Sequence, residues 1–388
     1  MHVVPVADAA PTLISNGFDE AVQFHLSDDF VINAEEDGEV VEVNPDVGLM
    51  TVKYKSGKTK TISLKPDIIK NSNSNFYTSN TYKFTHDKVG EKFKKDEPLA
   101  YNDKFFNYSK LNGLRYSIGP LTKVAFMSTY NTYEDAGITT EKFNERMKTT
   151  ITIKDDATFK RTDIILDMVK VGDHVNIGDP LVKFEESVDD DILAGMLSKM
   201  NDETANVIDS ETKGQIKATA AGKIIDIKVS TLVDPSDLSP SLAKIVRGYF
   251  NKGKKKIAYL SKYDKEGTIY KSGYLMTDDT EPTKNRYNQL KGYKNIDVLI
   301  EFFIEHDDVM KVGDKIAVYG PNKEIISEVI PKGFEPYSEF RPDEDIEVLT
   351  SPGTISRRMT IGIVPIMGAN KVLVELKRKI ADMAKFSG

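Results

Sequence analysis

Short strand-like runs, each ended by a turn, recur along the whole chain and restrict its fold more than any other feature of the sequence. The runs are rich in Val, Ile, Thr and Tyr, and Gly, Asp and Lys interrupt them. Such alternation is typical of β-strands joined by tight turns. The clearest runs are 38–43, 49–54, 213–229 and 298–304. We therefore expect a mainly β protein with a few helices, an α+β class.

Two segments have helical spacing instead. One is 190–200, and the other is the tail 370–386, whose apolar residues recur on one helical face. Pro and Gly are spread evenly, so no long flexible linker is expected. With 388 residues, the chain is long enough for two to four modules.

One turn motif recurs along the chain. The sequence KVGEKFKKDEPL at 88–99 is similar to KVGDHVNIGDPL at 170–181, and KVGDK at 311–315 repeats its opening. Gly followed by Asp or Glu fits a tight turn that leads into a short strand. The intervals are too irregular for a solenoid. We expect several small barrels or sandwiches that use the same turn, and this signal alone identifies no function.

Composition excludes several classes of site. The chain has no cysteine, which rules out disulfides, thiolate chemistry and cysteine-based zinc sites. Its five histidines include no His-x-x-x-His pair, which argues against a histidine-built metal site. The first residues do not resemble a signal peptide, and no apolar run is long enough to span a bilayer. The cytoplasm is the expected compartment.

A net charge of −7 argues against a protein that coats nucleic acid nonspecifically, so phosphate binding would need locally placed cations. One cationic cluster lies at 248–265, where lysines are flanked by aromatic residues. The lysines of interest are Lys254, Lys255 and Lys256. They could hold single-stranded nucleic acid by charge while the aromatic residues stack on its bases. Alternatively, the segment is a solvated hairpin whose aromatic side chains face the core.

Two further segments contain residues suited to phosphate chemistry. An apolar run beginning at Val124 leads directly to Glu134 and Asp135, and paired carboxylates at a strand end can hold Mg²⁺ or orient a metal-bound phosphate. Lys315 and Lys323 lie eight residues apart across a Gly-Pro turn, so two adjoining strands or a loop could direct both ammonium groups at one site. Solvated surface lysines are the alternative. The Walker A pattern is absent.

These segments follow a family-specific order. GDKIA at 313–317, GPNKEIIS at 320–327, EPY at 335–337 and RMTIG at 358–362 resemble, in that order, segments of the β (second-largest) subunit of multisubunit DNA-directed RNA polymerases. Upstream, 124–135, 86–100 and 4–42 are similar to other stretches of the same subunit. The chain therefore resembles the C-terminal half of that subunit.

The resemblance implies roles for individual residues. Lys315 and Lys323 match lysines that face the initiating nucleotide and the RNA 3′-end phosphates. Arg358 matches an arginine that contacts the triphosphate of the incoming NTP. Glu134 and Asp135 match an acidic pair near the second Mg²⁺ and the route by which NTPs enter.

Two other residues are candidates for substrate binding. The segment 356–358 reads Ser-Arg-Arg where the family has Ser-Arg, so Arg357 could be the functional arginine in place of Arg358. Asn322 belongs to the same motif as Lys323 and is predicted to contact the substrate as well.

The implied fold is a double-psi β-barrel with inserted barrel-sandwich and flap-like modules. The predicted boundaries are a β-rich N-terminal module at 1–114, the first part of the barrel at 115–150, a flap-like insertion at 151–294, the second part of the barrel at 295–365 and a C-terminal helix at 366–388.

The resemblance also implies partners. The Asn-Ala-Asp-Phe-Asp-Gly-Asp signature of the β′ subunit is absent, so the catalytic Mg²⁺ would be held mainly by a β′-type chain, and this chain alone would be inactive. Other implied partners are a polypeptide carrying the N-terminal half of β, a promoter-specificity factor, template DNA, nascent RNA and NTPs, with no membrane.

The chain departs from the family pattern at several positions, including Glu324, where a glycine is usual, and it lacks the C-terminal clamp segment. A divergent, split subunit resembles the polymerases of large bacteriophages. The compartment would then be the cytoplasm of a bacterial host, and the sequence leaves a place in the virion open. The alternatives to a polymerase subunit are a structural or assembly protein that keeps the fold without its chemistry, and a stand-alone β-sandwich binding module.

Overall fold

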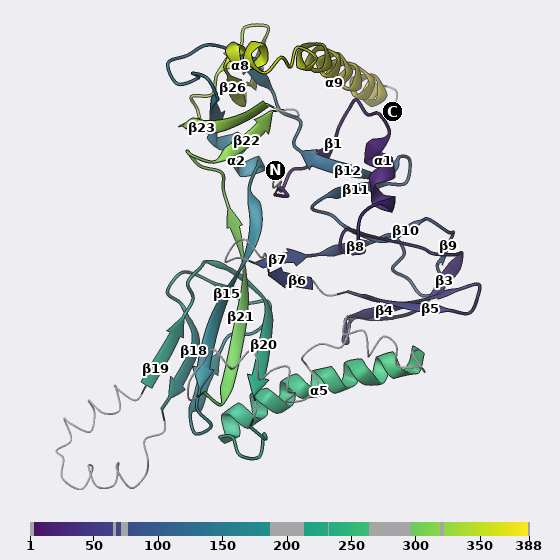
Figure 1. The fold of residues 1–388 in the computed structure, drawn as a ribbon, viewed down its shortest axis with the longest axis vertical. Helices are drawn as coiled ribbons and strands as arrows, with labels where there is room; N and C mark the ends of the chain where they lie inside the picture. The colour runs from purple at the N-terminus through teal and green to yellow at the C-terminus, as the bar shows by residue number, and fades with distance from the viewer. Residues whose placement is uncertain are drawn as a thin grey trace, which may run out of the picture. The chain divides into compact units, whose positions relative to one another are not determined.

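The computed structural model describes residues 4–64, 67–70, 77–186, 213–231, 233–263, 296–318 and 322–386 (Figure 1). These residues belong to two compact units, which we describe separately. Unit 1 comprises 1–33, 98–150 and 307–388, and unit 2 comprises 34–97 and 151–306. Each unit is assembled from segments that are distant in sequence. The predicted helix at 190–200 lies outside the described residues, and the predicted module boundaries stay a prediction.

Strands dominate unit 1, and its helices are few. Its strands are β1 (Ala10–Pro11), β2 (Val31–Asn33), β10 (Pro98–Asn102), β11 (Phe106–Ser109), β12 (Gly113–Gly119), β13 (Val124–Phe126), β14 (Ala136–Thr140), β22 (Lys315–Val318), β23 (Asn322–Ile330), β24 (Tyr337–Ser338), β25 (Arg341–Asp345) and β26 (Val348–Thr350). Its helices are α1 (Phe18–Ala21), the 3₁₀ turn η1 (Val22–Phe24), α2 (Glu141–Arg146), α8 (Pro352–Arg357) and α9 (Ile363–Phe386).

Unit 2 is also mainly β, with one long helix among its described residues. Its strands, counting two that begin or end at its border, are β3 (Gly38–Asn44), β4 (Leu49–Tyr54), β5 (Thr59–Ser63), β6 (Asp67–Lys70), β7 (Tyr77–Asn80), β8 (Tyr82–Phe84), β9 (Lys92–Phe93), β15 (Thr149–Phe159), β16 (Ile164–Met168), β17 (His174–Val175), β18 (Pro180–Glu185), β19 (Lys213–Lys217), β20 (Gly222–Thr231) and β21 (Val298–Asp308). The helix is α5 (Pro240–Tyr263). All four predicted strand runs are confirmed, as is the mainly β class.

The core of unit 2 surrounds β21, which lies between β20 and β15 in a six-stranded sheet. Every residue from Val298 to Ile304 is buried, so both faces of the strand are covered. Phe302 is completely buried and packs with Phe159 and Leu181. A continuous apolar run is what such a doubly covered strand requires. The exception is Glu301, whose carboxylate forms a 2.9 Å ion pair with Lys154 on β15.

Helix α5 corrects the hairpin interpretation of 248–265. Ser239 precedes it, with its hydroxyl accepting from the amide of Leu242, and Pro240 opens the first turn, an arrangement that favours helix initiation. Leu242, Val246 and Phe250 recur every fourth residue and enter the core of unit 2. The apolar residues with helical spacing begin upstream of the lysine cluster, and they make this segment part of a helix. The part of that interpretation that placed aromatic side chains in the core is confirmed for Phe250 and Tyr259, which are buried.

The three copies of the recurring sequence motif form the same turn. Gly90, Gly172 and Gly313 all have positive φ, at 86°, 101° and 95°. Each copy places a carboxylate on the amide of its first lysine, at 3.2, 2.7 and 2.8 Å. Each leads directly into a strand, namely β9, β17 and β22. Glycine is needed here because other residues adopt positive φ only at a cost. The predicted role of the motif is confirmed.

A five-stranded sheet organises the part of unit 1 that contains the phosphate-chemistry candidates. Its order is β13-β26-β14-β23-β22, so it combines strands from 124–140 with strands from 315–350 (Figure 1). Strand β14 runs parallel to β23 and antiparallel to β26. Two chain segments almost two hundred residues apart are thus hydrogen-bonded into one sheet.

Helix α9 covers the predicted helical tail 370–386, and the last two residues of the predicted segment 366–388 lie outside the described residues. Ion pairs tie one side of it to β25 and the residues around it: Arg341 reaches Glu375 at 2.5 Å, and Arg378 pairs with Glu344. Among the described residues, no helix combines the length and apolar character needed to cross a membrane.

Candidate functional site

The β22–β23 hairpin separates its residues cleanly between two faces. Ile316, Asn322, Glu324 and Ile326 are buried, whereas Lys315 and Lys323 are exposed. This follows from the period of two along a strand, which sends successive side chains to opposite faces. The two candidate lysines therefore belong to the outward face.

The register of the hairpin places the two lysines near each other. Lys315 is paired with Ile325, and Lys323 is paired with Ala317. Lys315 and Lys323 are consequently diagonal neighbours on one face, a separation of about 7–8 Å between backbone positions that long side chains easily bridge. The sequence prediction that adjoining strands direct both ammonium groups to one side agrees with this arrangement.

Arg358 reaches the backbone of the same hairpin from the end of helix α8. Its guanidinium donates to the backbone carbonyl of Lys323 at 3.0 Å and forms a 2.7 Å ion pair with Asp135. Ser351 caps the start of helix α8, its hydroxyl accepting from the amide of Gly353, and Arg358 follows the last residue of the helix. The structure therefore joins Arg358 to the hairpin backbone at Lys323 and to Asp135.

Arg357 occupies a separate and more exposed position. It pairs with Glu134 at 3.1 Å, and its guanidinium lies 5.8 Å from the centre of the Tyr133 ring. The side chain of Arg357 is 56% exposed, compared with 27% for Arg358. The two consecutive arginines thus bind the two consecutive carboxylates, one each, and Arg358 is in addition hydrogen-bonded to the hairpin backbone.

The backbone is strained at both sides of these ion pairs. Glu134 has φ 53° and Met359 has φ 54°, a left-handed conformation that costs about 1 kcal/mol or more for residues other than glycine. A hydrogen bond of 2.9 Å from the Thr354 hydroxyl to the Glu134 carbonyl holds the loop against α8. These contacts hold the loop in place and so restrict the orientation of the Glu134 and Asp135 side chains.

Asn322 is placed differently from the lysines. It is 1% exposed, and its side-chain oxygen accepts a 3.1 Å hydrogen bond from Thr360. Its amide nitrogen is buried and has no hydrogen-bond partner within the described ranges. The side chain thus connects the hairpin to the segment after α8, and its predicted contact with substrate stays a prediction.

Glu134 and Asp135 can supply only part of a metal site. Each binds an arginine through one oxygen and keeps a second, and both side chains are more than half exposed. Mg²⁺ takes six oxygen ligands in near-octahedral geometry. No group of three or more potential ligands gathers anywhere in the described part of the chain. The pair therefore fits a site in which another molecule provides most of the ligands.

The buried carboxyl group of Glu324 lies beneath the outward face of the hairpin. The sequence analysis did not identify it as part of the site. Glu324 is completely buried on β23 and accepts a hydrogen bond from the Thr350 hydroxyl on β26 through Oε1. Its Oε2 has no hydrogen-bond partner among the described residues. Gly137 on β14 makes room for it, since a Cβ there would lie 2.5 Å from Oε2.

Burial raises the pKa of Glu324 to about 7, against the opposing effects of the Thr350 hydrogen bond and the Arg358 charge. The sequence did contain a sign of this buried carboxyl group. Glu324 is a charged residue at an inward-facing position of a strand with alternating burial, between the outward-facing Lys323 and Ile325.

We expect Glu324→Gln to remove a pH dependence of stability. In the native protein Glu324 keeps its proton up to about pH 7, whereas in the unfolded chain it ionises near the ordinary glutamate pKa of about 4.5. The folded state binds the extra proton in that window, so stability falls as pH rises through it. At about pH 8 the Gln variant should be more stable than the parent by roughly 1–2 kcal/mol.

Urea unfolding of the two proteins between about pH 5 and pH 8 measures this difference. Glu328→Gln is the matched control, because Glu328 lies on the same strand but is exposed. Identical pH profiles for the parent and the Glu324 variant would rule out the protonated buried carboxyl.

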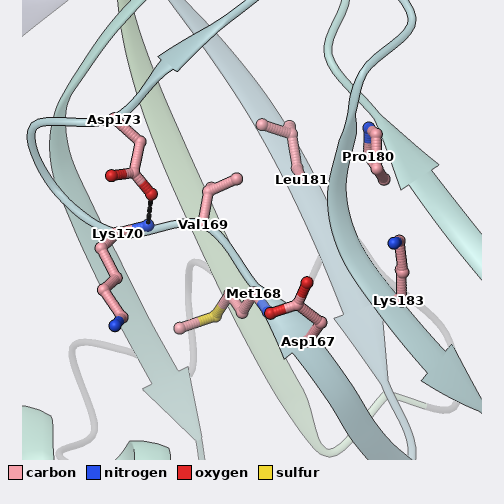
Figure 2. Close-up of a pocket in the computed structure, with 8 residues that line it drawn as sticks. All are labelled: Asp167, Met168, Val169, Lys170, Asp173, Pro180, Leu181 and Lys183. Carbon is pink, nitrogen blue, oxygen red and sulfur yellow. Dashed lines mark hydrogen bonds between the residues drawn. The ribbon is translucent and has the colours of Figure 1, made fainter.

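The remaining candidates lie in unit 2. Lys254, Lys255 and Lys256 belong to α5, and Lys254 and Lys255 are exposed. Figure 2 shows a cavity of about 290 Å³ in the same unit, next to the turn at Lys170, where Asp173 accepts from the Lys170 amide. Its lining contains none of the predicted site residues. The lining residues are Asp167, Met168, Val169, Lys170, Asp173, Pro180, Leu181 and Lys183.

Comparison with known families bears on the site. The family model described as RNA polymerase Rpb2, domain 6, matches residues 60–387, which is most of the chain. The chain belongs to this family. The matched Rpb2 domain 6 region contains the β22–β23 hairpin, α8 and both carboxylates of the site, and the predicted resemblance to an RNA polymerase β subunit is confirmed.

One curated relative extends the family assignment. The DNA-directed RNA polymerase subunit beta of Mycoplasmopsis pulmonis (strain UAB CTIP) is 24% identical over 371 residues, an alignment that covers 94% of this chain. The chain spans 26% of the length of that relative. The Rpb2 domain 6 chain thus corresponds to one part of a β subunit.

Proposed function

We propose that this chain is the C-terminal β-subunit portion of a multisubunit DNA-dependent RNA polymerase and contributes the cations that bind NTP and RNA phosphates. The observations that support this proposal best are that Lys315 and Lys323 share the outward face of the hairpin and that Arg358 donates to the backbone carbonyl of Lys323. A stand-alone β-sandwich binding module would not require three cations at that place.

The chemistry of nucleotidyl transfer suits this arrangement. Negative charge accumulates on the phosphoryl oxygens in the transition state, so catalysis depends on placing cations around them. Lysine ammonium groups act as point charges, and the planar guanidinium of arginine can bind two phosphate oxygens at once. Asp135 holds one edge of Arg358, which orients the side chain before substrate arrives. We assign the triphosphate contact to Arg358 and a supporting role to Arg357.

We assign Glu134 and Asp135 to the periphery of a Mg²⁺ site that a β′-type chain completes. When bound, Mg²⁺ would neutralise charge on the phosphate oxygens. The contribution of this chain is to present two carboxylates whose remaining oxygens face outward, each kept in place by an arginine. Without the partner the chain is expected to be inactive.

We infer that the site is built on a double-psi β-barrel formed by 115–150 and 295–365, with a flap-like insertion between them. The five-stranded sheet supports this inference because it interleaves β13 and β14 with β22, β23 and β26 in both parallel and antiparallel pairs. The proposed partners are a chain with the N-terminal part of β, β′-type subunits and a promoter-specificity factor, acting on template DNA and nascent RNA. A split, phage-type enzyme in the cytoplasm of a bacterial host remains our proposal for its source.

Affinity purification of the tagged protein from its native source tests the assignment. We expect co-purifying chains that carry the Asn-Ala-Asp-Phe-Asp-Gly-Asp signature, and template-dependent incorporation of labelled NTPs by the purified assembly. A protein recovered without such chains would contradict a polymerase role. Recovery of the assembly with synthesis unaffected by loss of Lys315, Lys323 and Arg358 would instead support a structural role in assembly.

A further inference from the structure

All the charged residues of helix α5 are positive. Its 24 residues include no Asp or Glu, although the chain as a whole has a net charge of −7. Its cationic residues are Lys244, Arg247, Lys252, Lys254, Lys255, Lys256 and Lys262. This composition differs from that of an ordinary solvated helix, which mixes both signs of charge.

Both ends of α5 are fixed to unit 2. Near its start, Leu242 and Val246 are completely buried in the core around β21. Near its end, Leu260 packs with Leu49 of β4, and the Tyr259 hydroxyl lies 3.0 Å from that of Thr51. The helix therefore bridges two β-structures of the same unit, as Figure 1 shows for α5 between β20 and β4.

The cations gather on the side of α5 that faces away from these contacts. Lys244, Arg247, Lys255 and Lys262 are exposed and recur at intervals of three, eight and seven residues, which places them on one helical face. Lys254 lies beside them. From Lys244 to Lys262 the face extends about 27 Å at 1.5 Å per residue. We name this set, with Lys252, the α5 cationic face.

Among the described residues, most of this charge has no acidic partner. In the described part of unit 2, Lys244, Lys252, Lys254 and Lys255 form no ion pair, and Lys262 is the member that pairs with an acid, Glu42 at 2.5 Å. Gly248 and Ala258 are exposed on the same side and carry little or no side chain. The surface is thus cationic, rigid and open to close approach.

We propose that the α5 cationic face binds the phosphodiester backbone of a nucleic acid. A row of exposed ammonium groups from Lys244 to Lys255, about 17 Å along the helix, matches a linear polyanion, because each neutralised phosphate releases a condensed counterion. The aromatic residues of α5 are not placed for stacking, since Phe250 and Tyr259 are buried and the half-buried Tyr249 and Tyr263 pack against core clusters of unit 2. Binding is therefore electrostatic and independent of base sequence. The choice of nucleic acid over other polyanions rests on the proposed polymerase function.

The test compares the full-length chain with Lys244→Gln/Lys254→Gln/Lys255→Gln. Glutamine has nearly the helix propensity of lysine, so α5 should persist, which far-UV circular dichroism checks. The matched control is Lys88→Gln/Lys94→Gln/Lys95→Gln, which removes the same charge from exposed positions around β9 in unit 2. None of these residues belongs to the proposed catalytic site.

Fluorescence anisotropy would measure binding of labelled single-stranded RNA, duplex DNA of equal length and polyglutamate across a salt series. We expect the α5 variant to lose affinity for nucleic acid by at least about tenfold at low salt, with a shallower dependence of affinity on salt. The control should bind as the parent does. The RNA and DNA measurements distinguish which nucleic acid the face prefers.

Equal losses in both triple variants, or no loss in either, would overturn the proposal. So would tight binding of polyglutamate by the parent, which would indicate an acidic protein as the partner. Because the assay needs neither partner chains nor NTPs, its failure is distinguishable from failure of the proposed polymerase role.

Discussion

Lys323→Ala in the reconstituted polymerase should reduce the rate of nucleotide addition by about two orders of magnitude while the subunits still assemble. The Lys323 side chain is exposed on the outward face of β23, so its removal opens no cavity in the core. Its backbone carbonyl, which accepts from Arg358, remains in the variant. What is lost is the cation that we propose to face phosphate oxygens, and such a cation acts most strongly when charge develops in the transition state. Single-turnover extension of an RNA primer measures the rate.

Two controls make this result specific. Lys323→Arg keeps the charge and should retain more activity than the alanine variant, although the planar guanidinium fits a point-charge site less well. Lys110→Ala removes an exposed lysine from the turn between β11 and β12 and should leave the rate unchanged. Extension at the parental rate by Lys323→Ala would refute the role assigned to this residue.

Gly222→Ala should destabilise unit 2 by about 2–4 kcal/mol. Gly222 opens β20, where an added Cβ would lie 2.0 Å from the carbonyl oxygen of Glu305 on β21. The obstacle is backbone, and β20 is hydrogen-bonded to β21 from Lys223 through Thr231, so the strands cannot separate locally. The added methyl group therefore has to displace the central ladder of the unit.

Urea unfolding of the full chain, followed by protease susceptibility of unit 2, measures the loss of stability. Gly119→Ala is the matched control, because nothing lies within 4 Å of a Cβ built at that strand position. It should change stability by less than about 0.5 kcal/mol. Equal stability of the Gly222 variant and the parent would show that the close approach of β20 to β21 is not a packing constraint.

Local patterns in the sequence predicted the local structure well. The strand runs, the tail helix and the recurring Gly-Asp turn depend on periodicity and on the φ preference of glycine, which neighbouring residues determine. The exception was the segment around Lys254. Its cluster of lysines and aromatic residues obscured a helical repeat that begins at Leu242, outside the segment considered.

The sequence by itself therefore determined the β class, the turns, the family and the identity of the candidate cations, because each of these depends on patterns within short contiguous segments. Only the tertiary structure decided which residues meet. The ion pairs of Arg357 and Arg358 with Glu134 and Asp135 join positions more than two hundred residues apart, and the buried Glu324 depends on Gly137 and Thr350 on two other strands. These contacts follow from the pairing of β14 with β23 and β26. Strand pairing between distant segments depends on the packing of the whole sheet and not on a local sequence pattern.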